Sequence, residues 1–138
     1  LPDSIKNLVI LKKLKIDHNK IKKLYIDFTN LTCLEELWAS ANPINEISST
    51  IGSLKNIREL YLNKCNLTAI PASITNLIKL EELSLNNNKI TKLPKGFNKL
   101  TNLKQLNIRD NPIETVYLYE ILSYNPGIWI DVLNQDKK

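Results

Sequence analysis

The 138-residue sequence predicts an α/β solenoid, a right-handed, curved stack of short coils with a parallel sheet on its concave face. Two repeating blocks predict it. The form LxxLxL, followed three positions later by an asparagine in four of the five units, returns at a constant 23-residue interval, starting at Leu11, Leu34, Ile57, Leu80 and Leu103. A second form, LPxxIxxL, recurs between these blocks. Since no single unit can bury its leucines alone, the units must stack.

The LxxLxL block predicts a short strand in every unit. Its apolar residues alternate with polar ones, which is the period-2 pattern of a strand with one buried face. The asparagine ends the strand, because its amide can bond turn backbone that would otherwise be buried without a partner. This position reads Asn19, Asn42, Cys65, Asn88 and Asn111. Cys65 can replace the amide only weakly, since a thiol is a poor donor and acceptor.

The LPxxIxxL block predicts the return segment on the convex face. Its apolar residues stand four and then three apart, a spacing typical of a helical or 3₁₀ segment. Pro71 and Pro94 fit the first position of such a turn. The strands are expected to be more closely spaced than the return segments, so the stack curves with the strands inside.

Together the two blocks resemble the leucine-rich repeat family, and most closely its 23-residue intracellular Ras-group type. Similar repeats occur in bacterial proteins, including some that act inside host cells. The resemblance covers residues 1–116. It implies a solenoid that recognises proteins through its concave face, as a signalling scaffold or an effector-type domain. It also implies an intracellular location, in the cytoplasm or, for a bacterial effector, in the host cytosol.

The sequence predicts five repeats over residues 1–116 and a C-terminal cap over residues 117–138. The cap consists of a short helix, about residues 117–124, and a degenerate last strand within the sequence IWIDV. Asn134 falls one further interval after Asn111, as in a decayed sixth repeat. The alternative to a cap is a docking site formed by Tyr117, Tyr119, Tyr124 and Trp129.

The first unit has no comparable cap. Leu1 already occupies a position of the repeat. We therefore expect further repeats upstream of Leu1, and the alternative is that residues 1–10 act as a poor cap.

Equal positions of successive repeats should form columns on the concave face. This places Trp38 beside Tyr61, one strand away, and outside the core. An exposed aromatic pair is typical of the centre of a binding site. The alternative is that the two rings pack only against each other and against Lys15, in a cation–π contact.

A second column carries Glu36, Glu59 and Glu82 on adjacent strands. Like charges in such positions repel, so a sequence selected for folding alone would tend to avoid them. One position earlier the signs alternate strictly, which favours structural ion pairs, in the order Lys12, Glu35, Arg58, Glu81 and Lys104. The glutamate column therefore favours a role in binding, and the alternative is that neighbouring cations partly screen its repulsion.

These columns predict a non-catalytic module that binds a protein carrying basic and apolar groups. The aromatic pair would anchor the partner, the glutamates would pair with its cations, and polar residues would set its register. The predicted site comprises Trp38, Tyr61, Glu36, Glu59, Glu82, Lys15, Asn63, Asn86, Asn87, Arg109 and Asp110.

Charge and composition disfavour nucleic-acid binding, catalysis, metal binding and a membrane span. The net charge is +5, and residues 1–23 carry all of the excess. The concave positions are nearly neutral with an acidic centre, which disfavours nucleic acid. No constellation around the single histidine, His18, suggests catalysis, and no spacing suggests a metal site, a cofactor or a small-molecule substrate. No segment is apolar for long enough to span a membrane. We expect a monomer with two free cysteines.

The sequence is also compatible with two alternative hypotheses about function. In the first, the chain is a targeting segment of a larger protein, whose basic first repeat contacts acidic lipid or nucleic acid. In the second, it is the substrate-recognition half of an enzyme whose catalytic domain lies elsewhere.

Overall fold

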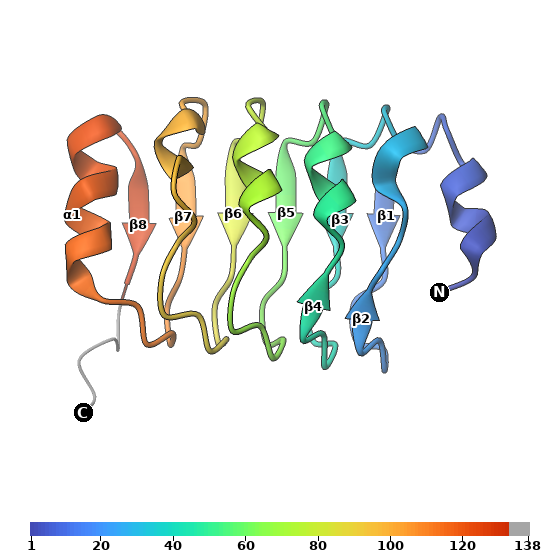
Figure 1. Ribbon diagram of the computed structural model, residues 1–138, viewed down its shortest axis with the longest axis horizontal. Helices are drawn as coiled ribbons and strands as arrows, with labels where there is room; N and C mark the ends of the chain where they lie inside the picture. Colours follow the sequence, from blue (N-terminus) through green and yellow to red (C-terminus); the bar gives the residue numbers. More distant parts are fainter. Residues whose placement is uncertain (133–138) are drawn as a thin grey trace.

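The computed structural model describes residues 1–132, which form six coils stacked in one direction (Figure 1). One strand from each coil joins a six-stranded parallel sheet in the order β1-β3-β5-β6-β7-β8. These strands are β1 (Lys13–Lys15), β3 (Glu36–Trp38), β5 (Glu59–Tyr61), β6 (Glu82–Ser84), β7 (Gln105–Asn107) and β8 (Trp129–Asp131). The predicted solenoid with a parallel sheet is therefore confirmed.

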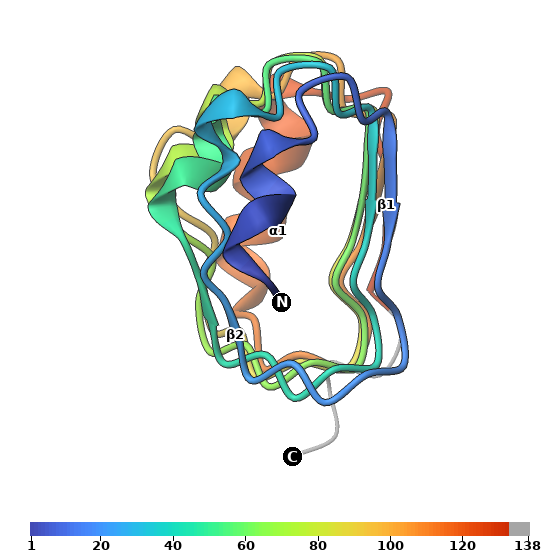
Figure 2. The ribbon, with the colours of Figure 1, turned by 90° about the vertical axis from the view of Figure 1, so that its right-hand side faces the viewer.

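The return segments are 3₁₀ helices on the side opposite the sheet, as Figure 2 shows along the stack. They are η1 (Asp3–Asn7), η2 (Phe28–Asn30), η3 (Ser49–Ser53), η4 (Ala72–Asn76) and η5 (Phe97–Lys99), and α1 (Thr115–Tyr124) takes this place in the sixth coil. Two short strands on the same side, β2 (Lys23–Leu24) and β4 (Glu46–Ile47), also pair in parallel. Pro71 directly precedes η4, whereas Pro94 begins the turn before η5.

The core lies between the sheet and the return segments. The middle residue of each central strand points into it, and Leu37, Leu60, Leu83 and Leu106 are all 0% exposed. Successive strands are matched residue for residue, so each leucine stacks on the next. Burying these columns supplies the main stabilising free energy, about 25 cal/mol for each Å² of apolar surface removed from water.

The asparagine position forms a buried ladder along the stack. Asn88 shows the pattern: its side-chain nitrogen donates to the carbonyls of Leu62 and Leu85, each at 2.8 Å. Its side-chain oxygen accepts from the backbone N–H of Leu67 at 3.1 Å. Equivalent bonds are made at Asn42 and Asn111. Each amide therefore ties its own turn to the preceding coil.

Cys65 replaces the amide only in part, as its chemistry predicts. Its thiol lies 3.5 Å from the carbonyl of Asn63 and 3.7 Å from that of Ala39. The backbone N–H of Ile44, which occupies the place of the Leu67 N–H, donates instead to the carbonyl of Asn42 at 2.7 Å. The ladder is thus weakest at the third coil, where a sulfur atom stands in for the amide oxygen and nitrogen.

The two thiols are free and should differ in reactivity. Burial raises the pKa of Cys65, which is 5% exposed, while Cys33 is only half-buried. Because the thiolate is the reactive form, we expect an alkylating reagent to modify Cys33 in the native protein and Cys65 only after unfolding. Mass spectrometry of the labelled peptides checks this. Equal labelling rates at the two positions would contradict it.

The sixth coil departs from the constant interval of the other five. Trp129 pairs with Gln105 and Asp131 pairs with Asn107, so this step is longer by a single residue than the step between earlier strands. The extra residue is absorbed because α1 replaces a shorter 3₁₀ segment. The helix begins at Thr115, so the boundary predicted at residue 116 falls within its first turn. The predicted role of Asn134 lies outside the described residues.

Candidate functional site

The predicted concave columns are present in the structure. The strand register places Trp38 opposite Tyr61 and Glu36 opposite Glu59, as the repeat interval predicts. Trp38 is half-buried on the solvent side of the sheet, whereas its neighbour Leu37 is fully buried on the other side. The strand therefore presents the indole to the concave face.

Trp38 lies between a cation and a second aromatic ring. The ammonium of Lys15 is 3.9 Å from the centre of the indole. The Tyr61 ring lies 4.7 Å away, centre to centre, with the planes tilted by 54°. Both contacts are favourable, since the face of an aromatic ring carries partial negative charge. The indole Nε1–H is buried and has no hydrogen-bond partner among the described residues.

The glutamate column is not uniform. Glu36 forms an ion pair with Lys13 at 2.6 Å, and the hydrogen bond from this pair raises the pKa of Lys13. Glu59 and Glu82 face each other across β5 and β6 and form no ion pair within the described part of the chain. Repulsion between these two carboxylates is therefore not offset by an ion pair with a cation of this part of the chain.

The hydroxyl of Tyr61 is shared with these carboxylates. It donates to Glu59 Oε2 at 3.2 Å. Burial, together with the carboxylates of Glu82 and Glu59, raises the pKa of Tyr61 well above its ordinary value. The phenol thus stays protonated at every physiological pH and acts as a donor to the acidic centre.

The preceding column consists of ion pairs, as its alternating signs predict. Glu81 contacts both Arg58 and Lys104 at 2.5 Å, and Lys104 and then Arg58 lower its pKa. Lys12 pairs with Glu35 at 3.3 Å. The cations of these pairs are largely exposed, so each pair contributes roughly 0–1 kcal/mol to the free energy of unfolding. The pairs hold neighbouring coils in register rather than offering free charge.

Asn63 and Asn86 belong to a second hydrogen-bonded ladder at the end of the strands. The side-chain oxygen of Asn63 accepts from the backbone N–H of Asn86 at 2.8 Å, and that of Asn86 accepts from the backbone N–H of Arg109 at 2.9 Å. Asp17 and Ser40 make the equivalent bonds in the earlier coils. The side-chain oxygens of both asparagines are therefore engaged by the backbone of the next coil, which the sequence alone did not indicate.

Asn87 and Asp110 occupy turn positions. They are exposed, with φ values of 58° and 56°, and the same left-handed conformation recurs at His18, Ala41 and Lys64. Asparagine and aspartate tolerate this region best among non-glycine residues. Both residues therefore border the concave face at the edge where the strands have already ended.

The repeat pattern did not predict two features of the concave face. Ser84 and Asn107, in the column of Trp38, are buried, at 3% and 8% exposure. Asp131 completes that column and lies 3.5 Å from Arg109 Nε. The alternation of IWIDV predicted this strand, but the constant interval did not predict its register, because the sixth coil contains one extra residue.

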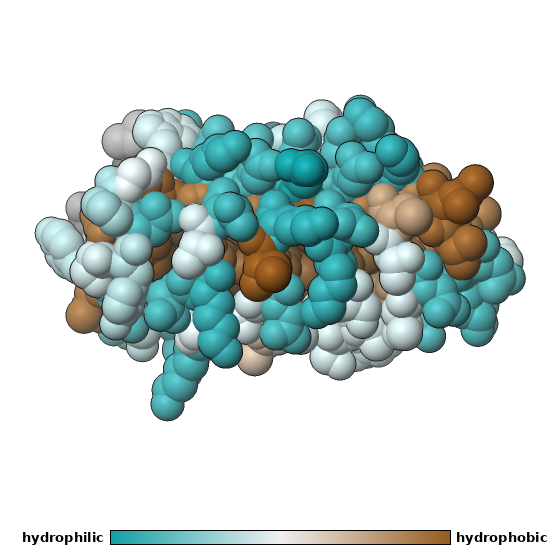
Figure 3. Space-filling view, turned by 90° about the horizontal axis from the view of Figure 1, so that it is seen from above, coloured by the Kyte–Doolittle hydropathy of each residue, from teal (hydrophilic) through white to brown (hydrophobic). Residues whose placement is uncertain are grey.

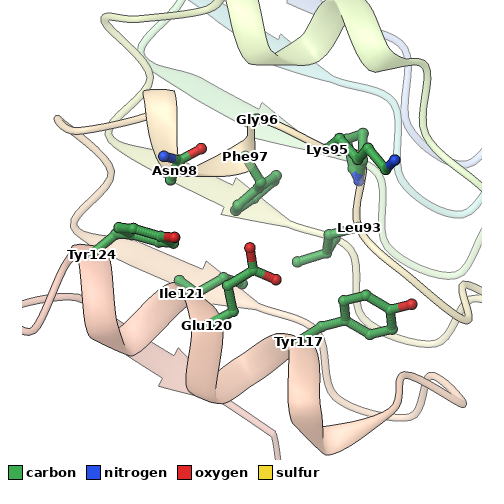
Figure 4. A pocket seen from close by; sticks show the side chains of 10 residues that line it. Leu93, Lys95, Gly96, Phe97, Asn98, Tyr117, Glu120, Ile121 and Tyr124 are labelled. Atoms are coloured by element: carbon green, nitrogen blue, oxygen red, sulfur yellow. The ribbon is translucent and has the colours of Figure 1, made fainter.

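The aromatic residues near the C-terminus do not form one surface. Trp129 lies on β8 in the glutamate column, while Tyr119 is exposed on α1. Tyr117 and Tyr124 line a small groove of about 130 Å³ between α1 and the fifth coil, with Phe97 at its floor (Figure 4). The four side chains of the alternative docking site are therefore divided among the sheet face, the exposed side of α1 and this groove.

The described residues give little support for catalysis around His18, for a metal site or for a membrane span. Asp17 accepts the backbone N–H of Ser40, and the adjacent His18 lies exposed in a turn. Within residues 1–132, no three potential ligands among His, Cys, Asp and Glu come together as a metal site would require. No helix in this range is long and apolar enough to cross a bilayer. Lys12, Lys13 and Lys23 of the basic first coil are already paired with glutamates of the second.

Comparison with known structures identifies the same architecture. A leucine-rich repeat protein of Leptospira interrogans matches with a TM-score of 0.89 and 37% identity, over 95% of this chain and 33% of that one. The plant peptide hormone receptor RGFR1, in complex with RGF2, matches with a TM-score of 0.79 and 24% identity, over 96% of this chain and 22% of that one. The functional domain of InlJ from Listeria monocytogenes matches with a TM-score of 0.75 and 19% identity, over 93% of this chain and 26% of that one.

The last two likenesses show the fold alone, and this chain spans about a third of the Leptospira protein. No curated protein matches it. The family model of the leucine-rich repeat region matches residues 1–120. With its repeat interval, its parallel sheet and its asparagine ladder, the chain belongs to the leucine-rich repeat family.

Proposed function

We propose that this chain is a non-catalytic recognition module that binds a protein partner through its concave face, with Trp38 and Tyr61 as apolar anchors. The tilted pair of rings, half-exposed on a sheet, carries this proposal. Tryptophan and tyrosine are enriched among the residues that dominate binding energy. The stacked coils hold the rings in place before a partner arrives, so little ordering entropy is lost on docking.

The partner segment would carry a basic side chain beside an apolar one. Glu59 and Glu82 form no ion pair within residues 1–132, while the aromatic pair lies further along the same face of the strands. An arginine or lysine between the two carboxylates would relieve their repulsion. The RGFR1 complex supports the general case, since a repeat solenoid of the same fold is found there with its peptide hormone.

The test is a selection of peptides from a displayed random library on the immobilised chain, followed by affinity measurements. Selected peptides should combine arginine or lysine with an aromatic or aliphatic residue. Replacing Trp38 by alanine should weaken their binding by at least about 30-fold, or about 2 kcal/mol. The melting midpoint should change little, because the indole lies outside the core.

Tyr25 provides a matched control. It is a 60% exposed aromatic residue that directly follows β2, on the opposite side of the coil from the sheet (Figure 2). The substitution Tyr25→Ala should leave peptide affinity unchanged. If Trp38→Ala also leaves it unchanged, or if both variants lose affinity equally, the concave face is not the site.

A further inference from the structure

A cation of the chain itself already occupies the face of Trp38. The ammonium of Lys15 on β1 lies 3.9 Å from the centre of the indole, and Tyr61 on β5 packs against the same ring from the other neighbouring strand. A second cation brought to this ring would be repelled by Lys15. A basic side chain of a partner is therefore expected to bind away from the indole, beyond β5.

The concave face has a hollow at that place, between β5, β6 and β7. Its volume is about 220 Å³, and it is lined by Arg58, Glu59, Glu81, Glu82, Lys104 and Gln105. Both cations of this lining are held by Glu81, at 2.5 Å. Glu59 and Glu82 form no ion pair within residues 1–132, so they are the carboxylates that the hollow offers to a partner's cation.

The two carboxylates lie nearer than the rings to the edge of the stack where the strands begin. Glu59 comes two residues before Tyr61 in β5, and the strands run downward in Figure 1. Figure 3 looks onto this edge and shows mainly hydrophilic side chains over the central coils. The concave face is therefore polar at the start of the strands and aromatic further along them.

The acceptors of the hollow suit a guanidinium better than an ammonium. Glu59 lies directly opposite Glu82, and Gln105 follows on the next strand. The side-chain nitrogen of Gln105 donates to Asn107 at 3.3 Å, which leaves its side-chain oxygen as a third acceptor. A guanidinium carries five N–H donors in a planar fork and can bond two carboxylates at once, whereas an ammonium has three donors and is more strongly hydrated. The hollow therefore favours arginine over lysine.

The strand register fixes the distance from the hollow to the aromatic pair. The rings stand two residues further along the strands than the carboxylates and one strand to the side. With a rise of about 3.3 Å per residue and about 4.8 Å between strands, the centres of the two pairs lie about 8 Å apart. In an extended peptide, residues i and i+2 point to the same side about 6.6 Å apart, and the long arginine side chain covers the difference. Adjacent residues point to opposite sides, and residues i and i+4 lie about 13 Å apart.

The ends of the central strands also favour an extended partner over a helical one. The side-chain oxygens of Asn63 and Asn86 accept bonds from the next coil, whereas their side-chain nitrogens donate to no acceptor within the described residues. An extended segment has backbone carbonyls that need donors, while a helix satisfies its own carbonyls. The two amides can therefore bond the main chain of an extended segment.

We propose that the concave face recognises an extended protein segment in which an arginine and an aliphatic or aromatic residue are separated by a single residue. The arginine binds between Glu59 and Glu82, and the apolar side chain packs on Trp38 and Tyr61. This inference rests on the proposed function and adds to it the spacing of the two side chains and the choice of arginine over lysine.

The test uses synthetic peptides of serine and glycine that carry one phenylalanine and one arginine, in both orders, separated by zero, one, two or three residues. Affinity is measured by titrating the ¹⁵N-labelled chain and following the indole N–H signal of Trp38 by NMR. In the better order, separation by one residue should give binding at least about tenfold tighter than any other separation. Lysine in place of the arginine should weaken that binding by about tenfold.

Equal affinities at all separations, a preference for three intervening residues as in a helix, or equal binding of the lysine peptide would each overturn the inference. So would an indole signal that none of the peptides moves. The proposed function would survive these results if library-selected peptides still lost affinity with Trp38→Ala, and it would fall with the inference if they did not.

A charge-matched variant tests the place of the arginine. Citrulline keeps the shape of arginine without its charge, so it should weaken binding to the wild type by at least about tenfold. Glu82→Gln should reduce this difference to less than about threefold, and its melting midpoint should not fall, because a repulsion is removed. Glu46→Gln removes the same charge from β4, on the opposite side of the coil, and should keep the full difference. An undiminished difference in Glu82→Gln, or an equal reduction in both variants, overturns the assignment.

Discussion

Replacing Asn88 by alanine is expected to lower the free energy of unfolding by about 3 kcal/mol. The amide of Asn88 donates to the carbonyls of Leu62 and Leu85 and accepts from the N–H of Leu67, all in a buried turn. Alanine leaves the carbonyl of Leu62 and the N–H of Leu67 without these partners and out of reach of water, whereas the carbonyl of Leu85 still accepts from Asn111. Each of the two unsatisfied groups costs about 1–3 kcal/mol. Urea unfolding followed by circular dichroism measures the change.

Asn19 provides the matched control for this substitution. It has the same place in the repeat and bonds the carbonyls of Ile16 and Asp17 at 2.9 Å, but it is exposed. Water can replace its bonds, so Asn19→Ala should cost less than about 1 kcal/mol. Equal losses for Asn19→Ala and Asn88→Ala would show that burial of the ladder contributes nothing.

Substituting alanine for Gly52 is expected to destabilise the protein by about 2 kcal/mol, the usual size of an overpacking effect. A Cβ atom at this position would lie 2.7 Å from the carbonyl oxygen and 2.8 Å from the Cβ of Ser73 in the next coil. Most of these atoms are backbone, so η3 and η4 would have to separate, and overpacking of this kind costs about 1–3 kcal/mol. The effect is measured as the shift in the midpoint of urea unfolding, with the slope of unfolding free energy against urea concentration unchanged.

Gly127 is the control for the Gly52 substitution. A Cβ atom there meets nothing within 4 Å, and its backbone is not in the left-handed region. The substitution Gly127→Ala should therefore change stability by no more than about 0.5 kcal/mol. A neutral Gly52→Ala would mean that the return segments can move apart without loss of packing.

The repeat interval was sufficient to predict the columns of the concave face. Each coil of constant length returns the chain to the same place, so Trp38 and Tyr61 had to be neighbours wherever the coils stacked in register. The alternating charges at Glu81 and its neighbours were predicted to pair for the same reason. Local pattern is enough here because every contact repeats between adjacent coils.

The sequence could not predict which hydrogen-bond partner each polar side chain selects. Asn63 and Asn86 were assigned to partner binding because they follow the strand, but their oxygens bond the next coil's backbone. The hydroxyl of Tyr61 likewise reaches Glu59, its neighbour on the same face of its own strand. Such choices depend on distances between individual atoms, which residue spacing does not encode.

By itself the sequence determined a stack of coils, the inward direction of its leucines and the column that each polar residue joins, because a fixed interval admits one register. Only the tertiary structure decided the longer step of the sixth coil and which charged side chains of the described residues form ion pairs. The reason is physical: periodicity describes contacts between equal coils, so it cannot describe a coil that differs from its neighbours or the distances between individual charged atoms.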